Sequence, residues 1–163
     1  MVVSLTLLLT TQCYARKCPN PEVISPCKCN NERGDPGFIE IRCWTNETID
    51  IKKILSKASE DPDVVNTVFD ILYIKEAKIT ELPEGATGKL RFKNVFIVPD
   101  VKSLQRIHSK AFASSQDTIR EFNVLATNVT NGPAPYSLVD LINSFPNLKK
   151  LLLYSTIDTI QDG

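Results

Sequence analysis

The chain has 163 residues, of which 42% are apolar and 23% are charged, so it is long enough for a domain with a hydrophobic core and is not a disordered tail. Its 19 basic side chains balance 19 acidic ones. Charge-driven binding of nucleic acid or of a membrane surface requires a surplus of Lys and Arg, so the composition argues against both classes.

Residues 1–15 have the features of a secretion signal. The apolar run at residues 2–9 is shorter than the roughly 20 apolar residues that span a membrane. Cys13 and Ala15 put small residues at the −3 and −1 positions of a cleavage site after Ala15, although no Lys or Arg precedes the run. The alternative is a buried N-terminal strand.

Cleavage after Ala15 would leave an even number of cysteines: Cys18, Cys27, Cys29 and Cys43. Evenness favours two disulfides formed in an oxidising compartment, while the spacing leaves all three pairings open. A structural zinc site is the alternative, but it usually has paired C-x2-C motifs, which these cysteines lack. Two N-x-S/T sequons, at Asn46 and Asn128, also favour export, and we expect a secreted, extracellular glycoprotein.

Residues 16–37 are rich in Pro, Asn and Gly, and we expect no regular element there. From Phe38 onward one pattern returns five times, an apolar residue followed by others three and five positions later. We call each instance a rung. The rungs are Phe38/Ile41/Cys43, Phe69/Leu72/Ile74, Phe92/Val95/Ile97, Ile119/Phe122/Val124 and Leu148/Leu151/Leu153.

The rungs predict short parallel strands that stack into an α/β solenoid. Successive rungs are 31, 23, 27 and 29 residues apart, near the roughly 20–29 of leucine-rich repeats. The last two apolar residues of a rung point to one face of a strand, and stacking buries that face against the return segments. Two returns show helical periodicity, at residues 51–58 and 138–145, with Asp50 and Ser137 as N-caps and Pro146 after the second. We expect these helices on the convex side.

At these residues the chain resembles secreted leucine-rich repeat proteins. The spacing Cys18-x8-Cys27-x-Cys29-x13-Cys43 is similar to their N-terminal cap, and the rungs to their L-x-x-L-x-L core. The resemblance implies a horseshoe with strands on the concave face, helices and turns on the convex face, and bridges Cys18–Cys29 and Cys27–Cys43.

A narrower resemblance comes from Cys-Pro, Cys-Lys-Cys, Ile-Arg-Cys and Phe-Pro-Asn-Leu-Lys. These motifs are similar to those of arthropod secreted repeat proteins named after the non-catalytic subunit of oplophorus-luciferin 2-monooxygenase. It implies an alternative function, a non-catalytic subunit of a secreted luciferase-type oxidoreductase complex.

The expected organisation is a signal peptide at 1–15, a cysteine cap with the first strand at 16–45, and repeats at 46–163. The residue at the ninth rung position, where the family favours Asn, varies between rungs and is Ala77 in the second rung. The chain stops ten residues after the last rung with no closing cysteines, so we expect a fragment of a longer protein, in which any membrane anchor would lie beyond Gly163.

The outward positions of the rungs are unusually apolar and aromatic, which predicts a surface for an extracellular protein partner. The predicted binding residues are Trp44, Tyr73, Phe96, Val98, Leu125, Leu152 and Tyr154. The alternative is that a neighbouring element covers this surface.

The alternating cations at residues 89–93 could contact a sulfated glycan, but the simpler interpretation is a solvent-exposed segment that leads into a strand.

For glycosylation we favour Asn128 over Asn46, because Asn46 also occupies a ninth rung position whose side chain would bond to the turn.

Catalysis has little support, since His108 is the only histidine and the acidic residues are dispersed. We therefore expect a binding protein without enzyme activity, metal or cofactor, and an enzyme remains the third hypothesis.

Overall fold

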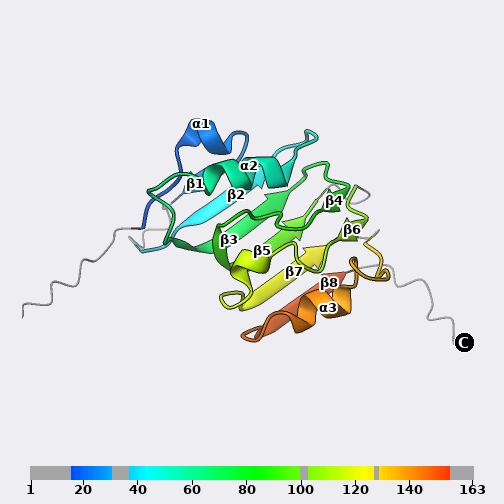
Figure 1. Cartoon of the computed structure of the whole chain (residues 1–163). Coiled ribbons are helices and arrows are strands. Elements are labelled where there is room, and N and C mark those ends of the chain that lie inside the picture. Colours follow the sequence, from blue (N-terminus) through cyan, green and yellow to red (C-terminus); the bar gives the residue numbers. More distant parts are fainter. Residues whose placement is uncertain (1–15, 31–36, 100–102, 127–128, 155–163) are drawn as a thin grey trace, which may run out of the picture.

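The computed structural model describes residues 16–30, 37–99, 103–126 and 129–154. They form an α/β structure around a six-stranded sheet in the order β1-β2-β3-β5-β7-β8, in which all pairs except β1–β2 are parallel (Figure 1). The strands are β1 (Lys28–Asn30), β2 (Glu40–Trp44), β3 (Val68–Lys75), β5 (Arg91–Val98), β7 (Glu121–Leu125) and β8 (Lys150–Tyr154).

The five parallel strands pair in chain order, and their register follows the predicted rungs. The fourth rung positions form one row across the sheet and the sixth positions another. These rows are Ile41–Leu72–Val95–Phe122–Leu151 and Cys43–Ile74–Ile97–Val124–Leu153. In β2, β3, β5 and β7 these residues are at most 2% exposed. The rung pattern therefore identified both the strands and their alignment.

The return segments cover one face of the sheet (Figure 1). They include α2 (Ile51–Ala58), the 3-10 helix η1 (Ala113–Ser115) and α3 (Leu138–Asn143), with the short parallel strands β4 (Glu81–Leu82) and β6 (Arg106–Ile107) between them. Asp50 and Ser137 cap the two α-helices as predicted, accepting hydrogen bonds from the backbone N–H of Lys53 and Asp140. The second helix ends at Asn143, before Pro146.

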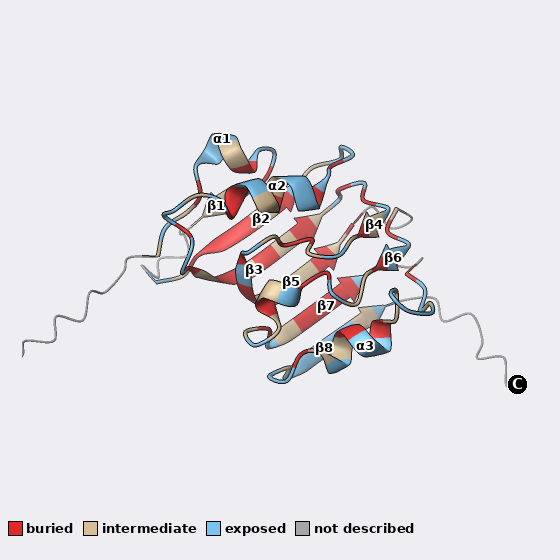
Figure 2. Cartoon of the chain, viewed as in Figure 1, coloured by how far each residue is buried: buried red, intermediate tan, exposed pale blue. Residues whose placement is uncertain are grey.

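The core lies between this face and the return segments, and Figure 2 shows the buried residues along the strands. Its aromatic rings pack in two groups, with tilted or edge-on geometry. The ring centroids of Phe69 and Phe92 are 5.5 Å apart, and Phe122 packs against Phe112 and Phe145, each at 5.4 Å. Rings of this size contribute much of the apolar area that stabilises a small domain.

The N-terminal segment is more regular than expected, so the prediction of no element in residues 16–37 is wrong. It contains α1 (Pro21–Ile24), capped by the Asn20 side chain, and β1, which pairs antiparallel with β2. The bridges Cys18–Cys29 and Cys27–Cys43 are formed as the resemblance implied, so these cysteines hold no zinc. The proline-rich composition did not predict α1 and β1, which have four and three residues. These elements are stabilised by the two disulfides and by pairing with β2 rather than by local propensity.

Leu151, at a core-facing rung position of β8, is 42% exposed. It is exposed because, within the described ranges, β8 is one of the two edge strands of the sheet. The predicted signal peptide, Asn128 and the chain end lie outside the described residues, as do Asp100, Thr127 and Thr156 at ninth rung positions. No helix in the described ranges is long and apolar enough to cross a membrane.

Candidate functional site

The candidate site is the outer face of the sheet, by which we mean the face opposite the return segments. Side chains at the third, fifth and seventh rung positions alternate with the buried ones and form rows across the strands. The rows are Glu40–Ile71–Asn94–Glu121–Lys150, Arg42–Tyr73–Phe96–Asn123–Leu152, and Trp44–Lys75–Val98 with Leu125–Tyr154. Residues far apart in sequence thus become neighbours at the strand spacing of about 4.8 Å.

The outer face is hollowed over β2, β3 and β5. The hollow has a volume of about 430 Å3 and is lined by Glu40, Arg42, Trp44, Ile71, Tyr73, Lys75 and Phe96. The Tyr73 and Phe96 rings form an aromatic pair, with centroids 6.2 Å apart and planes inclined at 57°. Two aromatic walls and an aliphatic side chain suit this hollow to an apolar side chain of a partner.

Trp44 stands at the rim of the hollow and is 56% exposed. Its indole Nε1 donates a hydrogen bond to Glu76 Oε2 at 2.9 Å, and Lys75 Nζ lies 4.0 Å from the ring centroid. The hydrogen bond from Trp44 and the contacts with Lys75 lower the pKa of Glu76, although partial desolvation opposes them. These contacts restrict the ring before anything binds, which reduces the entropy lost on association.

Charges in the hollow are largely paired within the protein. Arg42 Nε lies 2.6 Å from Glu40 Oε1, and Glu40 is only 3% exposed although it belongs to an outward row. Such a pair neutralises the floor of the hollow. The floor is therefore suited to apolar contact more than to a charged ligand.

The other end of the outer face, over β7 and β8, is more exposed. Leu125, Leu152 and Tyr154 are 37%, 48% and 65% exposed. Beside them Lys150 Nζ pairs with Glu121 Oε1 at 2.6 Å, and the same oxygen accepts a hydrogen bond from Asn123 Nδ2 at 2.7 Å. The hydrogen bond from Lys150 lowers the pKa of Glu121 against a smaller opposing effect of burial.

The seven predicted binding residues all belong to outward rows, but they are not equally exposed. Tyr73, Phe96 and Val98 are half-buried, whereas Trp44, Leu125, Leu152 and Tyr154 are exposed. In the described strand register, Tyr73 and Phe96 each have a paired residue on both neighbouring strands, whereas each of the four exposed residues is paired on one side only.

Sequence reasoning did not include Ile71 or Glu76 among the binding residues. Ile71 occupies an outward third position, so its place in a row could have been read from the rungs. Glu76 gave no such signal, because it follows β3 in a left-handed turn with φ of 59°, outside the strand alternation.

The Asn46 sequon is accessible. Asn46 and Thr48 are both exposed; Asn46 lies in the bend that follows β2, and Thr48 forms an isolated bridge with Lys78. The preference for Asn128 stays a prediction, because Asn128 lies outside the described residues.

His108 belongs to a polar cluster on the return side and not to the outer face. Its Nδ1 accepts a hydrogen bond from the Lys110 backbone N–H, and its ring meets Tyr136 edge-on at 5.7 Å. Tyr136 donates to Glu81 Oε1 at 3.0 Å, which raises the pKa of the tyrosine, and Arg106 pairs with Glu81 Oε2 at 2.7 Å. These contacts connect β4, β6 and the loop before α3.

Comparison with models of protein families, with curated proteins and with solved structures gave no match to this chain.

Proposed function

We propose that the chain is a secreted leucine-rich repeat module that binds an extracellular protein partner on the outer face of its sheet. The repeat interpretation is supported by five parallel strands paired in chain order, with every rung in register. A second ladder runs through the returns, where Lys78 N–H donates to Glu47 O and Gln105 N–H donates to Thr80 O. Two ladders with a core between them are what stacked repeats require.

The observation that carries the function is the group of apolar and aromatic side chains on the outer face, whose rows are interrupted by Lys75 and Asn123. Tyr73 and Phe96 wall the hollow, and Leu125, Leu152 and Tyr154 extend the apolar surface over the last two strands. Large exposed apolar patches often mark interaction sites, and aromatic residues are common anchors of protein interfaces. The partner therefore inserts an apolar or aromatic side chain into the hollow.

Secretion is supported by the chemistry of the N-terminal segment. Two disulfides join four cysteines, which is typical of oxidising compartments, and the exposed Asn46 sequon is compatible with passage through a secretory pathway.

The test compares capture of secreted proteins by wild-type chain and by a double variant, Phe96→Glu with Leu125→Lys. A matched control, Val65→Glu with Val139→Lys, introduces the same two charges at side chains that are 61% and 55% exposed away from the outer face. A captured protein is identified by mass spectrometry, purified, and its dissociation constant measured against all three chains. We expect the outer-face variant to weaken binding at least about a hundredfold and the control to leave it within about twofold.

Equal binding by the wild-type chain and the outer-face variant would refute the proposal. If the purified partner is the catalytic chain of an oxidoreductase, the result would favour the alternative, a non-catalytic subunit of such a complex.

A further inference from the structure

A row of charged residues crosses the sheet where its strands begin. Asp70 on β3 is followed by Lys93 on β5, then by Arg120 just before β7 and Lys149 just before β8. Backbone hydrogen bonds align the last three, since Arg120 N–H donates to Lys93 O at 2.7 Å and Lys149 N–H donates to Arg120 O at 2.8 Å. Neighbouring strands therefore carry cations repeated about every 4.8 Å.

The two ends of this row differ in charge balance. Asp70 is paired with both Lys93, at 2.7 Å, and Arg16, at 2.8 Å, so two cations share one carboxylate. Arg120 and Lys149 are exposed, and no carboxylate among the described residues pairs with either. Within the described part of the chain, positive charge is therefore left unpaired at the starts of β7 and β8, whereas Lys93 on β5 is paired with Asp70.

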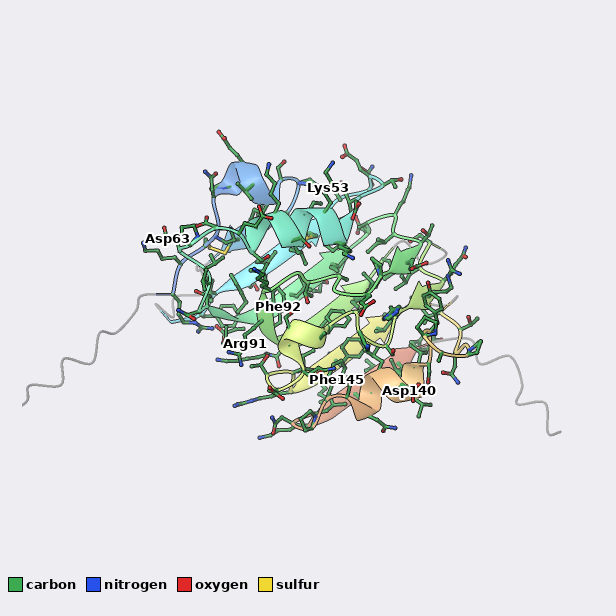
Figure 3. The ribbon with its side chains drawn as sticks, viewed as in Figure 1. Lys53, Asp63, Arg91, Phe92, Asp140 and Phe145 are labelled. Atoms are coloured by element: carbon green, nitrogen blue, oxygen red, sulfur yellow. A yellow bond between two sulfur atoms is a disulfide. The ribbon has the colours of Figure 1, made fainter. Side chains whose placement is uncertain are left out.

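A groove of about 350 Å3 follows this edge. It is lined by Val68, Lys93, Asp117, Thr118, Arg120, Asn147 and Lys149. Three of these residues are cations and Asp117 is the single acid among them. Arg91 adds a further exposed cation next to the groove, beside Val68 in the strand register, and Figure 3 shows it at the edge of the sheet next to the inward Phe92.

We propose that this groove binds the sulfate groups of a linear sulfated polysaccharide. Cations in a row at the strand spacing fit a ligand that carries closely repeated anions, and Asn147 and Thr118 add polar groups beside them. The chain as a whole has no net charge, so the positive charge is a local feature of this edge. The disulfides favour an oxidising compartment, and sulfated glycans are polymers with closely repeated anions outside the cell.

This surface is separate from the candidate protein-binding site. The groove lies where the strands begin, whereas Trp44, at the rim of the hollow, is the last residue of β2. The proposal therefore does not depend on the outer face binding a protein, and either can fail alone.

The test uses a heparin oligosaccharide as the sulfated probe and measures its affinity for the folded chain at several salt concentrations. The variant is Arg120→Gln with Lys149→Gln. The matched control is Lys52→Gln with Lys57→Gln, which removes two exposed cations from α2. We expect the groove variant to weaken binding roughly tenfold or more and to lower the slope of log affinity against log salt by about two, one for each lost ion contact. The control should leave both values unchanged.

Four outcomes would overturn the proposal. They are no binding of heparin by the wild-type chain at physiological salt, an equal loss in the α2 control, equal binding of fully desulfated heparin, and equal affinity for duplex DNA of the same length. The last two would show that the sulfate groups are not recognised. All four exchanged side chains are exposed, so the variants should fold, and their melting temperatures verify this.

Discussion

Asp70 forms hydrogen bonds with both backbone polar groups of Ile39, its N–H and its C=O. The backbone N–H of Ile39 donates to Asp70 Oδ2 at 3.0 Å, and the backbone N–H of Asp70 donates to Ile39 O at 2.8 Å. Arg16 and Lys93 neutralise the same carboxylate. The start of the first parallel strand is thus attached to the second, and the N-terminal segment is attached to both.

This arrangement makes the stability of the fold depend on pH through Asp70. Burial by itself raises the pKa of Asp70, but the hydrogen bonds from Lys93, the Ile39 backbone and Arg16 outweigh it, so the folded-state pKa lies below the ordinary value. A depressed folded-state pKa contributes stability that is complete above the unfolded pKa, about 3.9, and is lost as pH falls through the folded-state value.

We predict that Asp70→Asn lowers the free energy of unfolding by about 1–3 kcal/mol at neutral pH, because it leaves Arg16 and Lys93 without their carboxylate. The difference from wild type should shrink below pH 4. Urea unfolding at a series of pH values measures it, and a difference that stays constant down to pH 2 would contradict the assignment.

Of the described residues Gly85, Gly88 and Gly132, Gly88 has the least room for an added methyl group. Its φ is +57°, and an added Cβ would lie 2.7 Å from Ser56 Cα in α2. We expect Gly88→Ala to lower the free energy of unfolding by about 2 kcal/mol or more. Gly85→Ala is the control, because Gly85 has a similar φ of +64° with nothing within 4 Å of the added atom, and it should cost about 1 kcal/mol. Equal losses would show that the contact with α2 is unimportant.

Phe96 on β5 and Phe122 on β7 allow the effect of a mutation on stability to be distinguished from its effect on partner binding. Phe122 is fully buried against Phe112 and Phe145, so Phe122→Ala should cost about 3–5 kcal/mol in thermal or urea unfolding. Phe96 is half-buried on the outer face, and Phe96→Ala should cost less than about 1.5 kcal/mol while weakening partner binding. A Phe96 variant that unfolds as readily as the Phe122 variant would place Phe96 in the core instead.

Trp44 is the only tryptophan of the chain, so its fluorescence reports on the rim of the hollow. We expect the partner to shift the emission to shorter wavelength, because it removes water from an indole that is 56% exposed. The heparin oligosaccharide should leave the emission unchanged, since its groove is at the opposite ends of the strands. A shift with heparin alone would show that the two surfaces are not separate.

Tyr136 should titrate at higher pH than an ordinary tyrosine. Its hydrogen bond to Glu81, together with partial desolvation and the negative charge of Glu81, raises its pKa, and Arg106 offsets this only in part. In tyrosinate absorbance titrations, Tyr136→Phe should remove the transition at highest pH, and Glu81→Gln should move it downward. An unchanged titration in Glu81→Gln would refute the assignment.

Much of the fold could be predicted because the apolar spacing within each rung is a local pattern that fixes which side of the strand each residue faces. A residue pair such as Leu72 and Ile74 must face the same side of a strand, and five such pairs could be buried only by stacking in register. The helix starts followed from Asp50 and Ser137, whose side chains satisfy backbone N–H groups within three residues. Elements stabilised by distant groups, such as α1 and β1, escaped prediction.

The amino-acid sequence by itself determined which residues face inward, where the strands align and which side chains form the outward rows, because alternation along a strand is a property of the backbone. Tertiary structure alone decided how deeply each outward residue lies, as in the recessed pair Tyr73 and Phe96 beside the exposed Trp44. It also brought Lys93, Arg120 and Lys149 together at one groove, because residues 27 and 29 positions apart in the sequence become neighbours only when their strands pair.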